Sequence, residues 1–339
     1  MKTINVALLG AGRMGSEHAL NMRSFPGVQT LVVAAPHTPS AEKVADLVGA
    51  KHVLSSPEEA IERQDVDAVV IVTPTSTHAR LIEHAARSGK AIFCEKPVAL
   101  DLTETARVLR VVEEKGVLFQ IGFQRRFDVG FMAAREAIQQ GTLGDLEQFR
   151  AVGRDPAPPP IEYLKVSGGI FLDQAIHDFD AARFLVGEVE EVLAWGAVRV
   201  NPEIGALGDA DTVTTLLKFK NGTLGVIENS RRAVYGYDIR TEVFGSQGKY
   251  VIEALPKTPV QHYGTHGIHM DHYHFFMDRF APAYRAELAA FFRVMQGSSE
   301  TLPGTFDALE SLKVGIAATR SYRENRPVKI MEIQEGVPA

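Results

Sequence analysis

Asp173 and His177 lie four residues apart in the segment 168–180, where the flanking residues Phe171, Ile176 and Phe179 predict a buried helix. Positions i and i+4 of an α-helix share one face, so the carboxylate and the imidazole are expected to lie one turn apart on the same side. Imidazole is the usual general acid–base group near neutral pH, and a nearby carboxylate is a common partner. The pair therefore suggests proton transfer, with a hydrogen-bonded structural histidine as the alternative.

A second candidate, Lys96, stands in Glu95-Lys96-Pro97 directly after the strand-like run Ala91 to Cys94. In an open α/β sheet, ligands bind outside the carboxyl ends of the strands. This position places Lys96 at an edge suited to a ligand, whereas a solvated lysine at the start of a loop is the alternative.

Gly10, Gly12 and Gly15 form the pattern G-x-G-x-x-G between the apolar run Ile4 to Leu9 and a helical pattern from Met14 to Arg23. The first glycine permits the tight turn, the second admits a pyrophosphate close to the backbone, and the third allows the helix to pack on the strand. The start of the helix then offers free N–H groups and a positive dipole end to the phosphates. In this strand–turn–helix context, the pattern predicts a dinucleotide site.

The first 122 residues alternate between strand-like and helical segments. Further strands are expected at Gln29 to Ala35, Ala68 to Thr73, Ala91 to Cys94 and Val117 to Ile121, and helices from an N-cap at Ser40 to Val48, at His78 to Ser88 and at Leu102 to Lys115. Such alternation is typical of a parallel sheet covered on both faces. We therefore predict an α/β Rossmann domain with a doubly wound parallel sheet over residues 1–122.

Residues 123–339 follow a different pattern. Strands are expected at Leu146 to Val152, Val189 to Val200, Thr212 to Phe219, Thr223 to Ser230 and Ile239 to Phe244, with helices at Phe131 to Gln139, after Gly168-Gly169, at Ala283 to Met295 and at Ala308 to Arg323. Asn221-Gly222 is a strong hairpin signal, because both positions tolerate positive φ. We predict an α+β domain with a large, open, mostly antiparallel sheet that serves substrate binding and oligomerisation.

The composition excludes several classes of protein. The chain has 339 residues with 36 Lys or Arg and 42 Asp or Glu, and a net charge of −6 provides no basic surface for nucleic acid. Its one cysteine, Cys94, excludes a disulfide framework and is typical of a reducing cytoplasm. The run Met1 to Val6 is too short for a signal peptide, and no stretch approaches the ~18 apolar residues of a membrane span. We therefore expect a cytoplasmic protein without nucleic-acid or membrane partners.

Taken together, these motifs resemble the glucose–fructose oxidoreductase and inositol dehydrogenase family over nearly the whole chain, and most of all its myo-inositol 2-dehydrogenase branch. The likeness rests on Gly10 to Gly15, Glu95-Lys96-Pro97, Gly122 to Asp128, Ser167 to Asp180 and Tyr235 to Asp238. It implies an NAD(P)-dependent oxidoreductase that oxidises a ring hydroxyl of a cyclic polyol, with myo-inositol giving 2-keto-inositol as the leading reaction. Another inositol isomer, an aldose sugar, or a non-catalytic dinucleotide sensor remain the alternatives.

The resemblance also implies roles for particular residues. Lys96, Asp173 and His177 match the catalytic trio: Lys96 would donate to the reacting oxygen, His177 would accept the hydroxyl proton, and Asp173 would orient His177 or bind a substrate hydroxyl. Arg126 and Tyr235 match positions that line the polyol site, together with the trio. A cis Lys96-Pro97 peptide bond is expected, and so is a homodimer or homotetramer formed through the C-terminal sheet.

The cofactor prediction concerns both nicotinamide dinucleotides. The expected contacts are Gly10, Gly12, Arg13, Met14, Ala35, His37, Thr38, Thr73, Pro74, Glu95 and Lys96. An acid that bonds the ribose hydroxyls of NAD is expected roughly 20 residues past the glycines, yet Ala35 occupies that place and no carboxylate adjoins it. We therefore expect NADP or NAD, with use of both.

Five histidines crowd the segment 262–274. Zinc ligands usually come in tight spacings on defined elements and often with cysteine, which this segment lacks. We predict no metal site here, and instead a loop that lines the substrate entrance or contacts another subunit.

Overall fold

The computed structural model describes residues 3–336, so Met1 and Lys2 of the N-terminal run lie outside the described residues. The chain forms two compact units. Unit 1 comprises the residues up to Gln124 together with Tyr284–Glu310, and unit 2 comprises Arg125–Ala283 and the residues from Ser311 onward. No helix within residues 3–336 is both long enough and apolar enough to cross a membrane.

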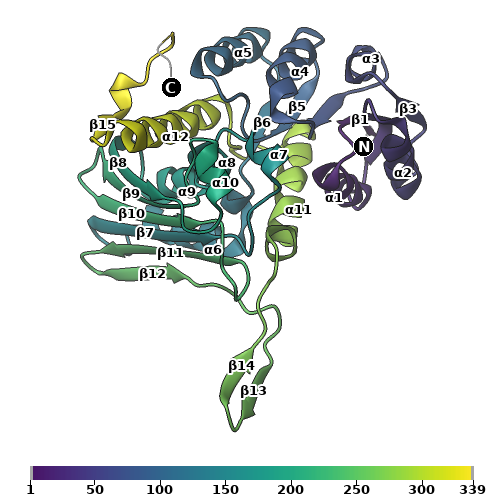
Figure 1. The fold of residues 1–339 in the computed structure, drawn as a ribbon. Coiled ribbons are helices and arrows are strands. Elements are labelled where there is room, and N and C mark those ends of the chain that lie inside the picture. The colour runs from purple at the N-terminus through teal and green to yellow at the C-terminus, as the bar shows by residue number, and fades with distance from the viewer. Residues whose placement is uncertain (1–2, 337–339) are drawn as a thin grey trace. The chain divides into compact units, whose positions relative to one another are not determined.

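Unit 1 is built on a six-stranded sheet in the order β3-β2-β1-β4-β5-β6, with every neighbouring pair parallel (Figure 1). The strands are β1 (Ile4–Leu9), β2 (Val28–Ala34), β3 (His52–Leu54), β4 (Ala68–Ile71), β5 (Ala91–Glu95) and β6 (Phe119–Gly122). The helices between them are α1 (Arg13–Arg23), α2 (Thr38–Val48), α3 (Pro57–Glu62), α4 (Thr75–Arg87) and α5 (Leu102–Lys115). This strand order belongs to the Rossmann fold, and the predicted α/β domain is confirmed.

Local side-chain chemistry explains where several of these helices begin. The carboxylate of Asp101 accepts a hydrogen bond of 2.7 Å from the Glu104 N–H and caps α5, which ends at Gly116 with φ +61°. The prediction of Ser40 as the N-cap of α2 was wrong, because the helix begins two residues earlier and His37 precedes it. Ser40 Oγ lies 2.7 Å from His37 Nδ1 instead. Strand β3 and helix α3 were missed, since both are short and carry little periodicity.

A C-terminal helix completes the core of unit 1. Helix α11 spans Phe276–Met295, and its residues Leu288, Phe291 and Phe292 are buried in the same apolar cluster as Phe93 of β5. The ring of Phe291 meets that of Phe93 at a centroid distance of 6.1 Å. The domain prediction assigns this segment to the second domain, residues 123–339. A single sequence carries no signal for contacts between residues nearly 200 positions apart, so the packing of α11 on unit 1 could not be predicted.

Unit 2 contains a seven-stranded sheet in the order β12-β11-β7-β10-β9-β8-β15. The strands are β7 (Leu146–Arg154), β8 (Val189–Ala197), β9 (Thr212–Phe219), β10 (Leu224–Ser230), β11 (Asp238–Gly245), β12 (Gly248–Ile252) and β15 (Val328–Lys329). All pairs are antiparallel except β7 with β10. The hairpin at Asn221-Gly222 joins β9 to β10, with Gly222 at φ +90°, so the mostly antiparallel sheet is confirmed.

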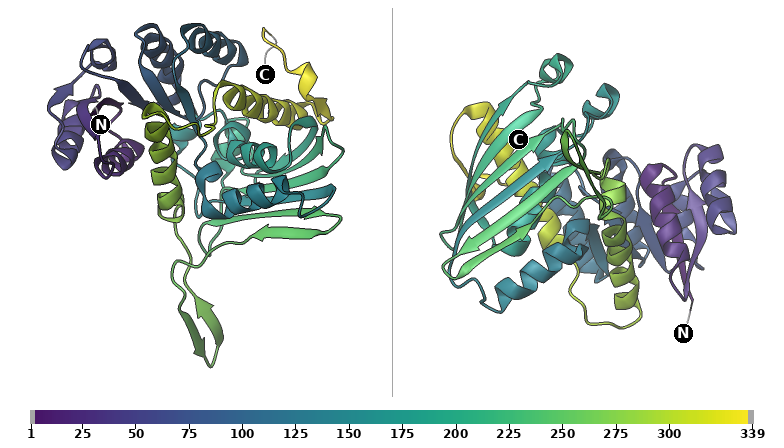
Figure 2. Two further views of the ribbon diagram at one scale, coloured as in Figure 1. Left: turned by 180° about the vertical axis from the view of Figure 1, so that it is seen from behind. Right: turned by 90° about the horizontal axis from the view of Figure 1, so that it is seen from below.

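Helices cover one face of this sheet. The longer ones are α6 (Val129–Gln139), α9 (Ile176–Leu185) and α12 (Thr305–Glu324), with the short helices α7 (Ile161–Leu164), α8 (Ile170–Asp173) and α10 (Pro202–Ala206). The opposite face is open in the view from below (Figure 2). It carries exposed apolar side chains, including Trp195, Leu216, Leu224 and Phe244.

A two-stranded hairpin of β13 (Gln261–Gly264) and β14 (Gly267–Met270) extends from unit 2 away from the large sheet (Figure 1). A loop was predicted here, and the structure shows paired strands instead. The rings of His262 and His269 stack across the pair at a centroid distance of 6.0 Å. Every residue of both strands is exposed.

Candidate active site

The glycine turn lies between β1 and α1, next to the point where the strand order of unit 1 reverses from β1 to β4. Gly10 has φ +111°, and a Cβ added there would lie 2.7 Å from the carbonyl oxygen of Val72. A Cβ on Gly15 would lie 2.3 Å from the carbonyl oxygen of Gly10. These two glycines are therefore required by the turn and by the close packing of helix on strand.

Gly12 differs from both, because a Cβ there would meet no protein atom within 4 Å. It is the N-cap residue of α1, and no side chain caps this helix end. The first N–H groups of a helix lack acceptors within the helix, and Arg13 and Met14 are the first residues of α1. An open approach to uncapped N–H groups fits the pyrophosphate of a dinucleotide.

Ala35 directly follows β2, where the ribose-binding acid was expected. The turn is tied to this strand, because the Gly10 N–H donates to the carbonyl oxygen of Ala34 at 2.8 Å. The following residues 36–40 include His37 and Thr38 but no carboxylate. Ala35 therefore stands at the end of the second strand, as predicted from its distance to the glycines.

Thr73-Pro74 lies just beyond β4, and Glu95 is the last residue of β5, with Lys96-Pro97 directly after it. The Lys96-Pro97 peptide bond is cis, as expected from the resemblance. His78 of α4 contacts both segments: Nε2 lies 2.8 Å from the carbonyl oxygen of Thr73 and Nδ1 lies 2.8 Å from that of Pro97. Burial lowers the pKa of His78, and the two backbone contacts oppose this shift.

Glu95 lies beside two buried side chains. His18 Nε2 is 2.8 Å from Glu95 Oε1. One side-chain nitrogen or oxygen atom from each of His18, Glu95 and Glu287 lies within 4.8 Å of the other two. Glu287 is fully buried, and burial, with the charge of Glu95, raises the pKa of its carboxyl group well above the ordinary value. The neutral acid is therefore favoured.

In unit 2, Asp173 and His177 lie near one another in sequence but not on one continuous helix. Asp173 ends α8 and His177 lies in the first turn of α9, so the prediction of a single helix was wrong. The Ala175 N–H bonds back to Ile170, five residues earlier, and this wider turn interrupts the helix. The pattern of buried apolar residues continues through the break, so no local pattern marks it.

Two donors hold the Asp173 carboxylate. Tyr163 donates its hydroxyl to Oδ1 at 2.7 Å, and Arg231 donates from Nη1 to Oδ2 at 3.1 Å. Arg231 is fully buried, whereas its sequence neighbour Arg232 is exposed. Burial and the charge of Asp173 raise the pKa of Tyr163, which therefore remains a donor.

Arg126 and Tyr235, the two predicted polyol contacts, each bond to an aspartate. Arg126 pairs with Asp180 through two hydrogen bonds, and its guanidinium lies 5.1 Å from the ring centroid of Phe184. Tyr235 lies between β10 and β11, is 47% exposed, and donates to Asp238 at 2.7 Å. Both side chains are thus held by partners within unit 2.

The structure therefore groups the predicted residues by unit. Unit 1 holds the cofactor candidates and Lys96, and unit 2 holds Asp173, His177, Arg126 and Tyr235. Sequence reasoning missed the positions next to them, which are His18, His78, Glu287 and Tyr163. A histidine among the apolar residues of an amphipathic helix, as at His78, was the sequence signal that could have identified one of them.

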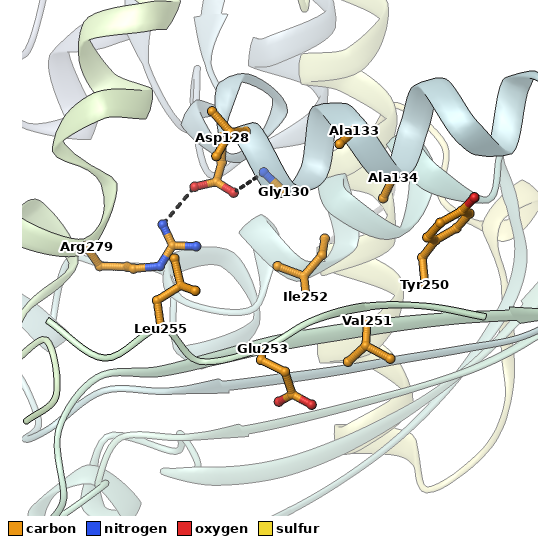
Figure 3. Close-up of a pocket in the computed structure, with 11 residues that line it drawn as sticks. Asp128, Gly130, Ala133, Ala134, Tyr250, Val251, Ile252, Glu253, Leu255 and Arg279 are labelled. Atoms are coloured by element: carbon orange, nitrogen blue, oxygen red, sulfur yellow. Dashed lines mark hydrogen bonds and ion pairs between the residues drawn. The ribbon is translucent and has the colours of Figure 1, made fainter. Parts of the chain in front are cut away.

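A separate cavity of about 360 Å³ in unit 2 contains none of the predicted site residues (Figure 3). Its walls are largely apolar, including Ala133, Ala134 and Ile252. Of its three charged residues, Arg279 and Asp128 pair with one another, with Arg279 donating at 2.7 Å. A cyclic polyol needs several hydrogen-bonding partners, so this cavity does not suit one.

The fold and the glycine turn define a dinucleotide-binding oxidoreductase with a second α+β unit. Residues 4–123 match the oxidoreductase family with an NAD-binding Rossmann fold, and residues 131–251 match the GFO/IDH/MocA C-terminal domain. The chain belongs to this GFO/IDH/MocA oxidoreductase family, as the resemblance implied, and its cofactor is a nicotinamide dinucleotide.

Several dehydrogenases are similar to this chain over nearly its full length. A myo-inositol 2-dehydrogenase of Thermotoga maritima is 40% identical over 97% of this chain and 99% of its own. An NAD⁺-dependent scyllo-inositol 2-dehydrogenase of Bacillus subtilis is 40% identical over 96% of each chain. The solved structure of a scyllo-inositol dehydrogenase from Lactobacillus casei, with bound NAD(H) and scyllo-inositol, is 29% identical, with a TM-score of 0.91 over 97% of this chain and 100% of its own.

Proposed function

We propose that this protein is an inositol dehydrogenase that oxidises one ring hydroxyl to a ketone, with myo-inositol to 2-keto-inositol as the leading reaction. Full-length similarity to dehydrogenases of two inositol isomers carries the proposal. The same similarity supports a cyclic polyol in general and leaves the isomer to experiment. An aldose is the alternative substrate within the same reaction type.

The residues of the chain suit this chemistry. His177 accepts the hydroxyl proton as the carbon–oxygen bond becomes a carbonyl, and Lys96 donates a hydrogen bond to that oxygen. Asp173, held by Tyr163 and Arg231, orients His177 or accepts from a neighbouring ring hydroxyl. When bound, the dinucleotide supplies the hydride acceptor.

The remaining site residues divide between cofactor and substrate. Arg126 and Tyr235 contact the polyol in this proposal. The dinucleotide is held by the glycine turn with Arg13 and Met14, by Ala35, His37 and Thr38 after β2, and by Thr73, Pro74, Glu95 and Lys96 at the ends of β4 and β5. A dinucleotide sensor without turnover is the alternative, and it would not require Lys96 or His177.

We further propose that the protein acts in the cytoplasm as a homodimer or homotetramer, without nucleic-acid or membrane partners. The apolar side chains on the open face of the unit 2 sheet support self-association, because a contiguous exposed apolar surface usually marks an interface.

The test is a panel of inositols and aldoses with NAD and with NADP, in which formation of the reduced nicotinamide is followed by absorbance. Lys96→Met and His177→Ala should each lower kcat by about 10²- to 10⁴-fold, the usual contribution of acid–base catalysis. In His177→Ala, binding of reduced cofactor, measured by fluorescence, should change less than about threefold. His84→Ala, at a partly exposed position of α4, is the control and should retain full turnover. Wild-type activity on no polyol, or His177→Ala with more than about half of wild-type kcat, would contradict the proposal.

A further inference from the structure

Lys96 stands between two residues that are each held by a buried histidine. Glu95 precedes it and contacts His18 of α1, and Pro97 follows it and contacts His78 of α4. All of these residues belong to unit 1. Neither histidine was among the residues that the sequence singled out.

The ring of His18 is fixed by its surroundings. It is fully buried, and it meets the rings of Phe93 and Tyr284 edge-on at centroid distances of 5.4 and 5.9 Å. Its Nε2 lies 2.8 Å from Glu95 Oε1. A packed ring that bonds a partly exposed carboxylate limits how far Glu95, and the peptide bond to Lys96, can move.

His78 joins the ends of two strands. It is 1% exposed, and its two nitrogens each lie 2.8 Å from a carbonyl oxygen, that of Pro97 at Nδ1 and that of Thr73 at Nε2. A carbonyl oxygen only accepts, so the neutral ring, which carries one N–H, donates to one of the two oxygens in each tautomer. The two nitrogens therefore act on different segments: Nδ1 on the turn that carries Lys96, and Nε2 on Thr73 of the predicted cofactor site.

We propose that His18 and His78 are positioning residues that hold Lys96 from its two sides, His18 through Glu95 and His78 through Pro97. The inference rests on the proposed function, in which Lys96 donates a hydrogen bond to the reacting oxygen. Neither histidine contacts the reacting atoms. Each keeps the Lys96 amine in the place from which it can donate, and a displacement of about 1 Å can cost on the order of 10²-fold in rate.

The two histidines use different ring nitrogens towards the Lys96 turn, and this permits a sharp test. The amide nitrogen of asparagine stands at the same bond distance from the backbone as Nδ1 of histidine, and that of glutamine at the distance of Nε2. His18→Gln and His78→Asn should therefore keep the contacts that hold Lys96. His18→Asn and His78→Gln should lose them.

At position 18 the glutamine variant should be the more active one, and at position 78 the asparagine variant. His18→Gln and His78→Asn should keep kcat within about threefold of wild type, whereas His18→Asn and His78→Gln should lose at least about tenfold, within the range that misplacement costs. His78→Asn frees Thr73, so its Michaelis constant for the cofactor should rise more than that of His78→Gln. His84 of the same helix is partly exposed and serves as the control, since His84→Asn and His84→Gln should be equal in kcat.

A second readout does not depend on turnover. The rate at which acetic anhydride acylates Lys96, followed by mass spectrometry, should rise at least about threefold in His18→Asn and His78→Gln and stay within about twofold in the other two variants, because a loosened turn exposes the amine. If wild type oxidises no polyol, the proposed function fails, and the order of acylation rates still decides the present inference. The inference would be overturned if the same amide, asparagine or glutamine, gave the higher kcat at both positions. It would also be overturned if the losses of kcat only followed the fall in the unfolding midpoint.

Discussion

Arg126 donates from Nε and Nη2 to the two carboxylate oxygens of Asp180, at 2.8 and 2.7 Å. The side chain of Asp180 is 2% exposed and that of Arg126 is 13% exposed. Asp180 also accepts from the Ser311 hydroxyl at 3.0 Å. The guanidinium is therefore part of the interior of unit 2, besides its expected role towards the polyol.

Arg126→Ala should destabilise the protein strongly, because it removes the two hydrogen bonds and the nearer counter-charge of the buried Asp180 carboxylate, whose other cation, Arg183, lies 3.8 Å away. Breaking such a pair typically costs about 3–5 kcal/mol. Urea unfolding would measure the loss, and adding Asp180→Asn to Arg126→Ala should restore part of it by removing the stranded charge. A loss below about 1 kcal/mol would show that water or another donor replaces Arg126. The effect on polyol binding is better measured in Arg126→Lys, which keeps the charge.

Glu287→Gln should stabilise the protein at alkaline pH relative to acidic pH. The pKa of Glu287 is raised in the folded state by burial and by Glu95. Its stabilising contribution is complete below the unfolded pKa of about 4.5 and falls as pH rises towards the folded pKa. Glutamine keeps a neutral donor and does not titrate, so the difference in unfolding free energy, variant minus wild type, should grow with pH.

Urea unfolding at pH 5 and pH 8 checks this expectation. The exposed Glu114→Gln serves as the control and should show no such trend. A difference between Glu287→Gln and wild type that is constant or shrinks from pH 5 to pH 8 would mean that Glu287 is ionised in the folded protein.

Leu216→Glu should dissociate the proposed oligomer, because it places a charge in the middle of the open sheet face. Leu216 pairs with Leu193 and Val226 on neighbouring strands, and Trp195 lies on the same face. Light scattering after gel filtration would give the mass of each variant. Leu47 of α2 has the same exposure of 41%, and Leu47→Glu is the matched control that should leave the mass unchanged. A monomeric wild type at micromolar concentration would contradict the proposed assembly.

Sequence patterns predicted the fold where local signals are strong. The bounds of α5 (Leu102–Lys115) and β9 (Thr212–Phe219) agree with the expectation at both ends, because a capping aspartate, a C-terminal glycine and the Asn221-Gly222 turn mark them. The parallel pair of β7 and β10 and the place of α11 could not be predicted, since both depend on contacts between distant residues.

In the candidate site, too, residues in local motifs were predicted and contacts between distant residues were not. The glycine turn and Lys96 were identified from short motifs whose chemistry is local. The partners Tyr163 and Arg231 of Asp173 come from other elements of unit 2, and no spacing along the chain connects them to it. The break between α8 and α9 was hidden for a related reason, because the buried face continues across it.

Ala35→Asp should shift cofactor use towards NAD. An acid at the end of the second strand bonds the ribose hydroxyls of NAD and repels a 2′-phosphate, and Ala35 provides neither effect. Arg13 at the start of α1, with His37 and Thr38 after β2, can instead offer positive charge or donors near that phosphate. We therefore expect measurable use of NADP by wild type beside NAD.

The deciding measurement is kcat/KM for each cofactor in wild type and in Ala35→Asp, at saturating polyol. The ratio of the NAD value to the NADP value should rise at least about tenfold in the variant, or about 1.4 kcal/mol at 1.36 kcal/mol per decade. Leu47→Asp supplies the matched control, since it adds the same charge at an exposed position of α2 outside the proposed cofactor site. It should shift the ratio less, because the carboxylate then does not stand at the end of the second strand. A wild type that prefers NAD by more than about a hundredfold, or about 2.7 kcal/mol by the same conversion, would contradict dual use and leave the ribose to be held by backbone groups and Thr38.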